Sequence, residues 1–573
     1  MTDLMRTALD TRRTGFARPT GVTPETATCS APGEVATRGP RLPRRFMLHP
    51  LSAILAVQAG LSLTLIWANT AFTDEAEYLW GGHLEIAHWL HGTPLPPTLA
   101  QTFSGSPIIY PPLGAIADGI GGLAAARLLS LIFMLAATIL LYLVASRLLG
   151  RTAALFSCAV WAISEPVIRL GAFASYDAIS ILAMATSVWL ALQVGFRRRR
   201  GEFVAAAAAS LALANATAYS TIVIDPIVIA FAFVAWLPAI GAKQARFCAA
   251  WLIGAYAILF TLIMTASRSW AGFAFTIVFR KAGTFVNGTS AISTILAAVW
   301  SYSGACIVLA AIGTVIALSA ESQYRRVLLV LAACAIVVVP AGQIYNFTDV
   351  SLDKHLAYGI WFAAIAAGYG CNRLLESLSV RRLMPAIVCF GLAFAYPAAD
   401  SWEAAWYKQH GWSNASRFVS ALRRVVGRTR GLIDASSEEY VAMYYTSEGR
   451  NWTRWNRTDL SLDPPGIAAG GLRAYYARIL DKGGYGVIAL FYTTTLKGLP
   501  VGALLSTSGY VAQQQVLNIV ASDTGSANGS ERGLPALTIC LEHDPAYRLD
   551  ASGSSSSITV KGVFTIWQRK SQT

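Results

Sequence analysis

Long apolar runs, repeated between about residue 51 and residue 399, constrain this chain more than any other feature of its sequence. A helix that crosses a bilayer needs roughly 20 mainly apolar residues. Only 13% of the 573 residues are charged and 55% are hydrophobic, whereas about 25% are charged in soluble globular proteins. The sequence therefore predicts a polytopic α-helical membrane protein and excludes a soluble enzyme or a disordered chain.

Eleven segments are apolar and long enough to be candidate membrane spans. They are Leu51–Ala68, Gly122–Ser146, Thr152–Leu170, Ala178–Phe196, Phe203–Tyr219, Ile222–Ile240, Phe247–Ala266, Ile292–Ser319, Val327–Tyr345, Leu356–Leu375 and Leu383–Ala399. With the short stretch from residue 47 that leads into the first span, they define a predicted transmembrane domain over residues 47–399.

Basic residues indicate how these spans are oriented. Residues 1–46 are rich in Arg and have no apolar period, so we predict a disordered basic cytoplasmic tail. Five loops on the same side as this tail carry the positive charge that marks cytoplasmic loops. Their basic residues are Arg147 and Arg151, Arg197–Arg200, Lys243 and Arg246, Arg325 and Arg326, and Arg381 and Arg382. The excess of 45 Lys and Arg over 31 Asp and Glu is thus first a topology signal, and a nucleic-acid partner is not expected.

The composition changes abruptly after the last span. Residues 400–573 are polar and rich in Gly, Tyr and Trp, and strand-like Tyr485–Tyr492 follows helix-like Gly471–Leu480. Eleven spans with the N-terminus inside leave this part outside, so we predict an α/β extracytoplasmic domain. The Ala-rich, Arg-rich composition suggests a bacterium, which makes the expected location the cytoplasmic (inner) membrane.

Acidic residues gather on the predicted outer face. The first outer loop, residues 69–121, contains Asp74, Glu75 and Glu77, followed by Tyr78–Leu90, whose period and Trp residues suit an interfacial helix. Asp177 lies in the turn before the fourth span. These acids can cap helices, or they can supply a general base at the membrane boundary, where partial desolvation tunes a carboxyl group for proton transfer.

Basic residues on the outer face complement these acids. Arg268, Arg280 and Lys281 lie in one predicted outer loop, and Lys354 and His355 lie in the next. Each can snorkel to the interface, or together they can clamp a lipid-linked phosphate.

The sequence contains no clear metal site. His83, His88 and His91 flank Glu85, but their spacing favours a surface helix with incidental His over a zinc site. The sequence leaves open whether a divalent metal ion bridges an acidic side chain and the phosphate of the donor. The cysteines fall mostly in apolar runs and indicate neither a disulfide framework nor a metal site.

Several motifs between residues 70 and 195 occur in a familiar order. They are Asp74-Glu75-Ala76-Glu77-Tyr78, Tyr110-Pro111-Pro112-Leu113, Ala126-Arg127-Leu128-Leu129-Ser130, Arg147-Leu148-Leu149-Gly150-Arg151, and Pro166 followed by Tyr176-Asp177. In this order and spacing the chain resembles the C-type (GT-C) membrane glycosyltransferases that use polyprenyl-phosphate sugars, related to protein O-mannosyltransferases and lipid A aminoarabinose transferases.

The resemblance implies a GT-C-like transmembrane domain and inverting sugar transfer on the outer face. Asp74 is then the base, Asp177 a second acid and Glu75 a support for the loop or a contact to the acceptor. Glu-Ala-Glu-Tyr after Asp74 differs from the Glu-Ala-Arg-Tyr of the aminoarabinose branch, which argues against lipid A as acceptor. Glu77, Tyr110 and Tyr176 are further candidate substrate contacts.

We therefore expect a glycosyltransferase that moves a sugar from a polyprenyl-phosphate carrier to a hydroxyl of a cell-envelope glycan, glycolipid or protein. Two alternatives remain at this point. A polytopic transporter or lipid flippase would place polar groups near the middle of the membrane, whereas these spans are nearly free of charge there. A membrane scaffold would bind wall polymers through the C-terminal domain without catalysis.

Overall fold

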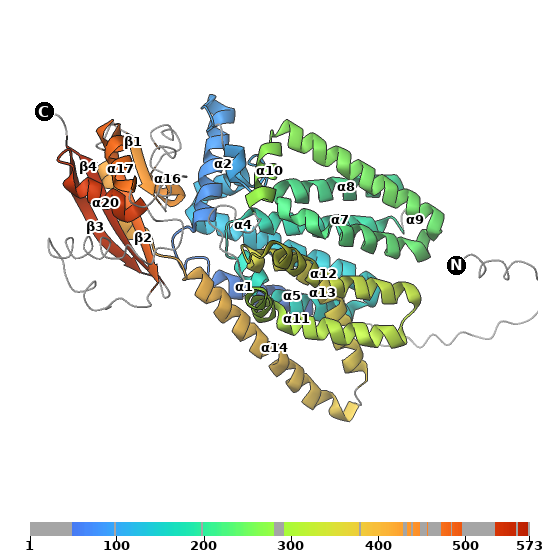
Figure 1. The fold of residues 1–573 in the computed structure, drawn as a ribbon. Helices are drawn as coiled ribbons and strands as arrows, with labels where there is room; N and C mark the ends of the chain where they lie inside the picture. The colour runs from blue at the N-terminus through green and yellow to red at the C-terminus, as the bar shows by residue number, and fades with distance from the viewer. Residues whose placement is uncertain are drawn as a thin grey trace, which may run out of the picture. The chain divides into compact units, whose positions relative to one another are not determined.

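The computed structural model describes residues 49–96, 99–195, 199–279, 291–377, 380–427, 432–436, 439–446, 455, 471–482, 484–495, 533–556 and 560–570. Helices dominate the part up to residue 409, coloured blue to ochre in Figure 1. They are α1 (His49–Leu63), α2 (Thr73–His91), α3 (Leu99–Thr102), α4 (Tyr110–Leu149), α5 (Arg151–Ala162), α6 (Glu165–Leu170), α7 (Tyr176–Gln193), α8 (Arg200–Thr217), the 3₁₀-helix η2 (Tyr219–Ile224), α9 (Asp225–Ala266), α10 (Trp270–Phe279), α11 (Ile292–Ala320), α12 (Gln323–Asn346), α13 (Leu352–Glu376) and α14 (Val380–Gln409).

All eleven predicted segments overlap helices of the structure, although the first, Leu51–Ala68, extends past the end of α1 at Leu63. Five helical stretches of the described chain are long and apolar enough to cross a membrane: Tyr110–Leu149, Tyr176–Gln193, Tyr219–Ala266, Ile292–Ala320 and Gln323–Asn346. A polytopic helical architecture is therefore present, while the count of eleven spans stays a prediction.

Glycine and proline explain where helices depart from the predicted segments. Helix α9 contains two predicted spans, separated by a kink at Gly241, whose φ of 75° is open to glycine at little cost. Helix α4 is interrupted in the same way at Gly121 and Gly122. The third predicted segment forms two helices, α5 and α6, because Pro166 suits the first turn of a helix and not its interior.

Helix α13 lies in the core of the helical part. Nearly every residue from Leu352 to Cys371 is buried, and the helix packs against α5, α11 and α12. Small residues make this contact close: a Cβ added at Gly368 would meet the carbonyl oxygen of Ala153 at 2.4 Å. A buried helix presents no polar face, which is why its sequence is apolar all round. Its first turn carries Lys354 and His355 toward α2 and α7.

A close helix contact at Gly82 fixes α2 against α4. A Cβ at this position would lie 1.9 Å from the carbonyl oxygen of Pro111. We expect Gly82→Ala to destabilise the protein by about 1–3 kcal/mol, because the backbones must separate. Gly119, a helical residue of α4 with open space around it, is the matched control. Thermal unfolding in detergent should show Gly119→Ala unchanged or more stable, and an equally stable Gly82→Ala would contradict the contact.

The C-terminal part combines helices with one sheet. Strands β1 (Leu432–Ser436), β2 (Tyr485–Thr495), β4 (Val560–Arg569) and β3 (Tyr547–Ser556) lie side by side in that order; β1 and β2 are parallel and the other pairs are antiparallel. The helices are α15 (Ser416–Val426), α16 (Glu439–Thr446), α17 (Leu472–Asp481) and α20 (Gly533–His543). Figure 1 draws these elements in orange and red.

The sequence predicted this α/β character from particular segments. The strand-like and helix-like pieces correspond to β2 and α17. Helix α14, however, continues from Val380 through the expected boundary at Ala399 to Gln409. The extracytoplasmic position of residues 400–573 stays a prediction.

Candidate active site

The first turn of α2 holds the acidic motif. The backbone N–H of Phe72 donates to Glu75 Oε2 at 3.0 Å, as in half of a capping box. Asp74 and Glu75 both lie in this turn, where the helix dipole favours negative charge. The acidic motif therefore both caps α2 and contributes to the candidate site. Its two carboxylates, of Asp74 and Glu75, have different surroundings.

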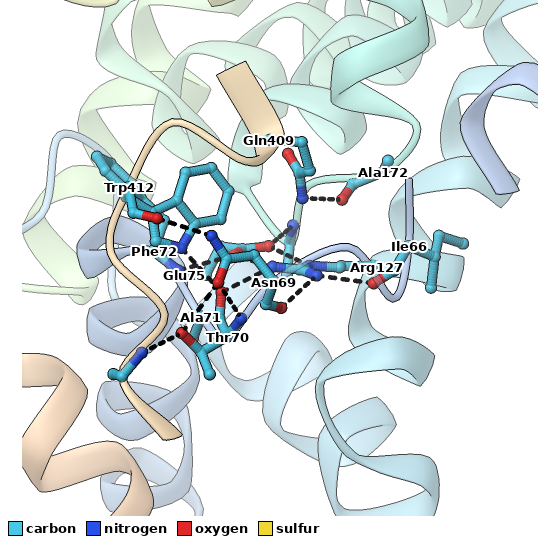
Figure 2. A network of polar contacts seen from close by, with 12 residues as sticks. Ile66, Asn69, Thr70, Ala71, Phe72, Glu75, Arg127, Ala172, Gln409 and Trp412 are labelled. Carbon is cyan, nitrogen blue, oxygen red and sulfur yellow. Dashed lines mark hydrogen bonds and ion pairs between the residues drawn. The ribbon is translucent and has the colours of Figure 1, made fainter. Parts of the chain in front are cut away.

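Glu75 is locked in a buried ion pair with Arg127 of α4, drawn in Figure 2. Arg127 Nε donates to Glu75 Oε1 at 2.8 Å and Nη2 donates to Oε2 at 2.6 Å, and both side chains are 0% exposed. Oε1 also accepts from the backbone N–H of Ala174 at 2.8 Å. With the Phe72 bond, the carboxylate accepts four hydrogen bonds, which is its full capacity.

The remaining donors of Arg127 bind the chain just before α2. Nη1 donates to the carbonyl oxygens of Ile66 at 2.7 Å and Asn69 at 3.1 Å, and Nη2 donates to that of Thr70 at 3.3 Å. A guanidinium has five N–H donors, and all five are used. Arg127 and Glu75 thus join α2, α4, the segment between α1 and α2, and the turn before α7. Figure 2 shows Arg127 between Glu75 and the segment that precedes α2.

Asp74 has a different environment. Its side chain is 32% exposed, and its Oδ2 accepts from Lys354 Nζ at 2.7 Å. Lys354 itself is 7% exposed and lies over the ring of Phe173 at 5.4 Å. Of the two neighbouring acids, only Asp74 is open to an incoming molecule, and it is paired with a cation from α13.

Asp177, like Glu75, is fully buried. Ser175 caps α7 by accepting from the Asp177 N–H, and its hydroxyl donates to Oδ2 at 3.1 Å. Tyr358 donates to Oδ1 at 3.3 Å, and His355 Nε2 lies 3.7 Å from the same oxygen. Because Lys354 and His355 are consecutive, the first turn of α13 brings the two acids into one cluster.

Aromatic residues form a wall beside the acids. The ring of Tyr78 lies 4.7 Å from that of Tyr176 and 6.3 Å from that of Tyr110, measured between centroids. Burial is the main cause that raises the pKa of Tyr78 well above its usual value, and the nearby carboxylate of Asp74 raises it further. The Tyr78 hydroxyl therefore stays protonated. Tyr110 is 0% exposed and belongs to the core beneath this wall.

The structure does not bring all the predicted residues into this cluster. Glu77 is 8% exposed on α2 and contributes to the field around Tyr78. Arg280 and Lys281 lie outside the described residues. Arg268 sits at the turn between α9 and α10, with a positive φ of 53°. The proposed cationic clamp is therefore represented, in the described part of the chain, by Lys354 and His355.

The histidine-rich stretch forms part of α2, as expected. His83 Nε2 lies 2.7 Å from Asp118 Oδ2, and His88 Nδ1 lies 2.8 Å from the carbonyl oxygen of Thr93. Among the described residues, no group of three or more His, Cys, Asp or Glu is arranged to hold a metal ion. The first half of α2 is buried by protein, and only Trp89 and Leu90 near its end expose large apolar surfaces suited to an interface.

The C-terminal part contacts this region. Tyr444 of α16 donates to Asp118 Oδ1 at 2.6 Å, and the Tyr445 hydroxyl accepts from the Ala71 N–H at 2.9 Å. Asp118 therefore links α2, α4 and α16, a role that its sequence surroundings did not indicate. The chain just before α2 is held from both the helical part and the C-terminal part.

Arg127 had no predicted role beyond its place in the motif Ala126-Arg127-Leu128-Leu129-Ser130. A charged residue inside the predicted span Gly122–Ser146 is a signal, because such residues are rare and almost always paired or functional. A second group without a predicted role consists of Arg169, Asp353 and Lys408. Arg169 pairs with Asp353, and Asp353 lies 3.0 Å from Lys408 Nζ. Asp353 directly precedes Lys354 in the chain, so these pairs anchor the start of α13.

Comparisons place this architecture among known folds. No protein-family model and no curated protein matches the chain. The crystal structure of the apo oligosaccharyltransferase of Archaeoglobus fulgidus matches with a TM-score of 0.53 at 12% identity over 78% of this chain and 70% of that chain. ArnT from Cupriavidus metallidurans, bound to undecaprenyl phosphate, matches with a TM-score of 0.53 at 10% identity over 91% and 98%.

A third match is the arabinofuranosyltransferase AftD from Mycobacteria. Its TM-score is 0.52 at 15% identity over 93% of this chain, which spans only 40% of AftD. All three are GT-C glycosyltransferases, so the expected GT-C fold is confirmed. At these identities the likeness concerns the fold alone.

Proposed function

We propose that this protein is an inverting glycosyltransferase that moves a sugar from a polyprenyl-phosphate carrier to a hydroxyl of a cell-envelope glycan, glycolipid or protein on the outer face of the bacterial inner membrane. The observation that carries the proposal is the partly exposed carboxylate of Asp74, 2.7 Å from Lys354 Nζ. The GT-C fold supports it, as do solved neighbours described as bound to undecaprenyl phosphate or dolichol-phosphate.

The chemistry follows from these two side chains. Asp74 takes the proton of the acceptor hydroxyl while that oxygen attacks the anomeric carbon. The bond from that carbon to the phosphate oxygen breaks, and polyprenyl phosphate leaves with the electron pair. Attack from the face opposite the leaving group inverts the anomeric configuration without a covalent intermediate.

Lys354 connects the base to the leaving group. Its ammonium group has three donors, of which one engages Asp74, and a cation near the departing phosphate stabilises the charge that develops there. His355 lies on the same turn, oriented by Asp177 at 3.7 Å. Glu75, with all its acceptor sites used, holds the loop rather than contacting substrate.

A donor panel tests this function. Purified protein in nanodiscs is offered synthetic polyprenyl-phosphate sugars, including arabinofuranose and mannose, and release of free polyprenyl phosphate is followed with acceptor extracts present and absent. We expect release from one donor, with sugar appearing on an acceptor. Folded protein that releases nothing from any donor but moves a labelled lipid across the bilayer would favour the transporter or flippase instead.

A further inference from the structure

Two cavities among the described membrane helices differ in their charge. One, of about 440 Å³ between α5, α11 and α14, has Asp400 as its charged lining residue. The other, of about 390 Å³, is lined by Arg147 and Arg325 and, in the part of the chain that the structure describes, by no acid. We call the second one the arginine cavity. Its volume is within the range of small-molecule sites, about 300–1,000 Å³.

The walls of the arginine cavity are amphipathic. Apolar side chains from four helices make up most of the lining, and the hydroxyl residues Ser322 and Tyr324 lie beside the arginines. The larger apolar members include Leu148, Leu149, Phe231, Leu328, Leu329 and Ile365. A site with cations at one end and hydrocarbon along its walls matches a molecule that has an anionic head and an apolar chain.

The arginine cavity lies far from the acidic site. Arg147 is in the last turn of α4, and Arg325 is in the first turn of α12. On α13, Lys354 and Ile365 are separated by eleven residues, which is about 16 Å at 1.5 Å per residue. The cavity therefore lies toward the ends of the helices that face away from the acidic site, and the proposed transfer reaction does not use it.

The charge around the cavity favours an anion. Glu321 pairs with Arg325 at 3.0 Å, but its other oxygen pairs with Arg373 at 2.8 Å and accepts from Tyr369 at 2.9 Å. The Glu321 carboxylate is thus divided between two guanidinium groups, and Arg373 also pairs with Glu376 at 3.0 Å. Arg147, from α4, makes a third arginine beside these two acids. A phosphodiester would complement this excess, and guanidinium groups bind phosphate oxygens in paired hydrogen bonds.

We propose that the arginine cavity binds an anionic glycerophospholipid, with its phosphate between Arg147 and Arg325 and an acyl chain along the walls formed by Leu148, Phe231 and Leu328. Basic pockets between membrane helices bind anionic lipid head groups by this chemistry. The lipid would hold α4, α9, α12 and α13 together next to the kink at Gly241.

Native mass spectrometry of the delipidated full chain tests the proposal. Phosphatidylglycerol and phosphatidylcholine are titrated separately, with wild type and the double variant Arg147→Ala/Arg325→Ala. Each basic residue near an anionic lipid is worth about fivefold in affinity, so the double variant should bind phosphatidylglycerol about 30-fold more weakly. Phosphatidylcholine binding to wild type should be weaker and should not change in the variant.

Matched variants separate binding from folding. Arg246, an exposed arginine of α9 that does not line the cavity, should be replaceable by Ala without loss of phosphatidylglycerol. Arg147→Lys/Arg325→Lys should restore most of the affinity lost in the alanine variant. Equal binding of both lipids by wild type, an equal loss in Arg246→Ala, or tighter arginine-dependent binding of polyprenyl phosphate would overturn the assignment.

Discussion

An Asp74→Asn variant should lose sugar transfer by about 10²–10⁴-fold, the usual contribution of a general base, while it folds as wild type does. Asparagine keeps the shape of the side chain, and its Oδ1 still accepts from Lys354 Nζ, which lies 2.7 Å from the carboxylate in the wild type. It has no capacity to take the acceptor proton. The measurement is release of polyprenyl phosphate from the donor that wild type uses, at matched protein concentration.

A surface carboxylate provides the control for this experiment. Glu202 lies at the exposed start of α8, paired with Arg199, and Glu202→Gln should transfer at the wild-type rate. Thermal unfolding should be the same for wild type and both variants. Wild-type transfer by folded Asp74→Asn would show that another group is the base and would remove the central residue of the proposed mechanism.

The helical fold was largely predictable because local composition determines it. Apolar runs of about 20 residues have few alternatives to a membrane helix, and each of the eleven segments overlaps at least one helix. The boundaries between consecutive helices were less predictable. Whether Gly241 separates two spans or kinks one long helix depends on backbone angles and tertiary packing, and the composition of α9 is the same in either case.

The acidic residues of the site could be predicted from the sequence, whereas most of the residues that pair with them could not. Asp74 and Asp177 stood out because they lie at the ends of apolar segments. The structure brings them together through Lys354 and His355, and Asp74 and Lys354 are 280 positions apart in the chain. A single sequence carries no signal for such a pairing. The distinction between exposed Asp74 and fully bonded Glu75 is likewise a property of packing, since the two residues are adjacent in the chain.

Breaking the pair between Glu75 and Arg127 should be the most damaging structural change in this region. Arg127→Met leaves the Glu75 carboxylate buried without its guanidinium, and removing one partner of a buried ion pair costs about 3–5 kcal/mol. The variant also leaves the carbonyl oxygens of Ile66, Asn69 and Thr70 without their donor. We expect a large fall in the thermal midpoint in detergent and little folded protein.

The double variant Glu75→Leu/Arg127→Met distinguishes a structural pair from a catalytic Glu75. With both side chains replaced, no unpaired charge is buried, although the backbone groups that they bonded still lack partners, and part of the lost stability should return relative to the sum of the single variants. The exposed pair Arg199–Glu202, with side chains 79% and 68% exposed, is the matched control, and breaking it should cost at most about 1 kcal/mol. If Glu75 only positions the loop, reduced but measurable transfer per folded molecule should remain in the double variant, because Asp74 and Lys354 are unchanged. Full stability without any transfer would instead assign Glu75 a direct role beside Asp74.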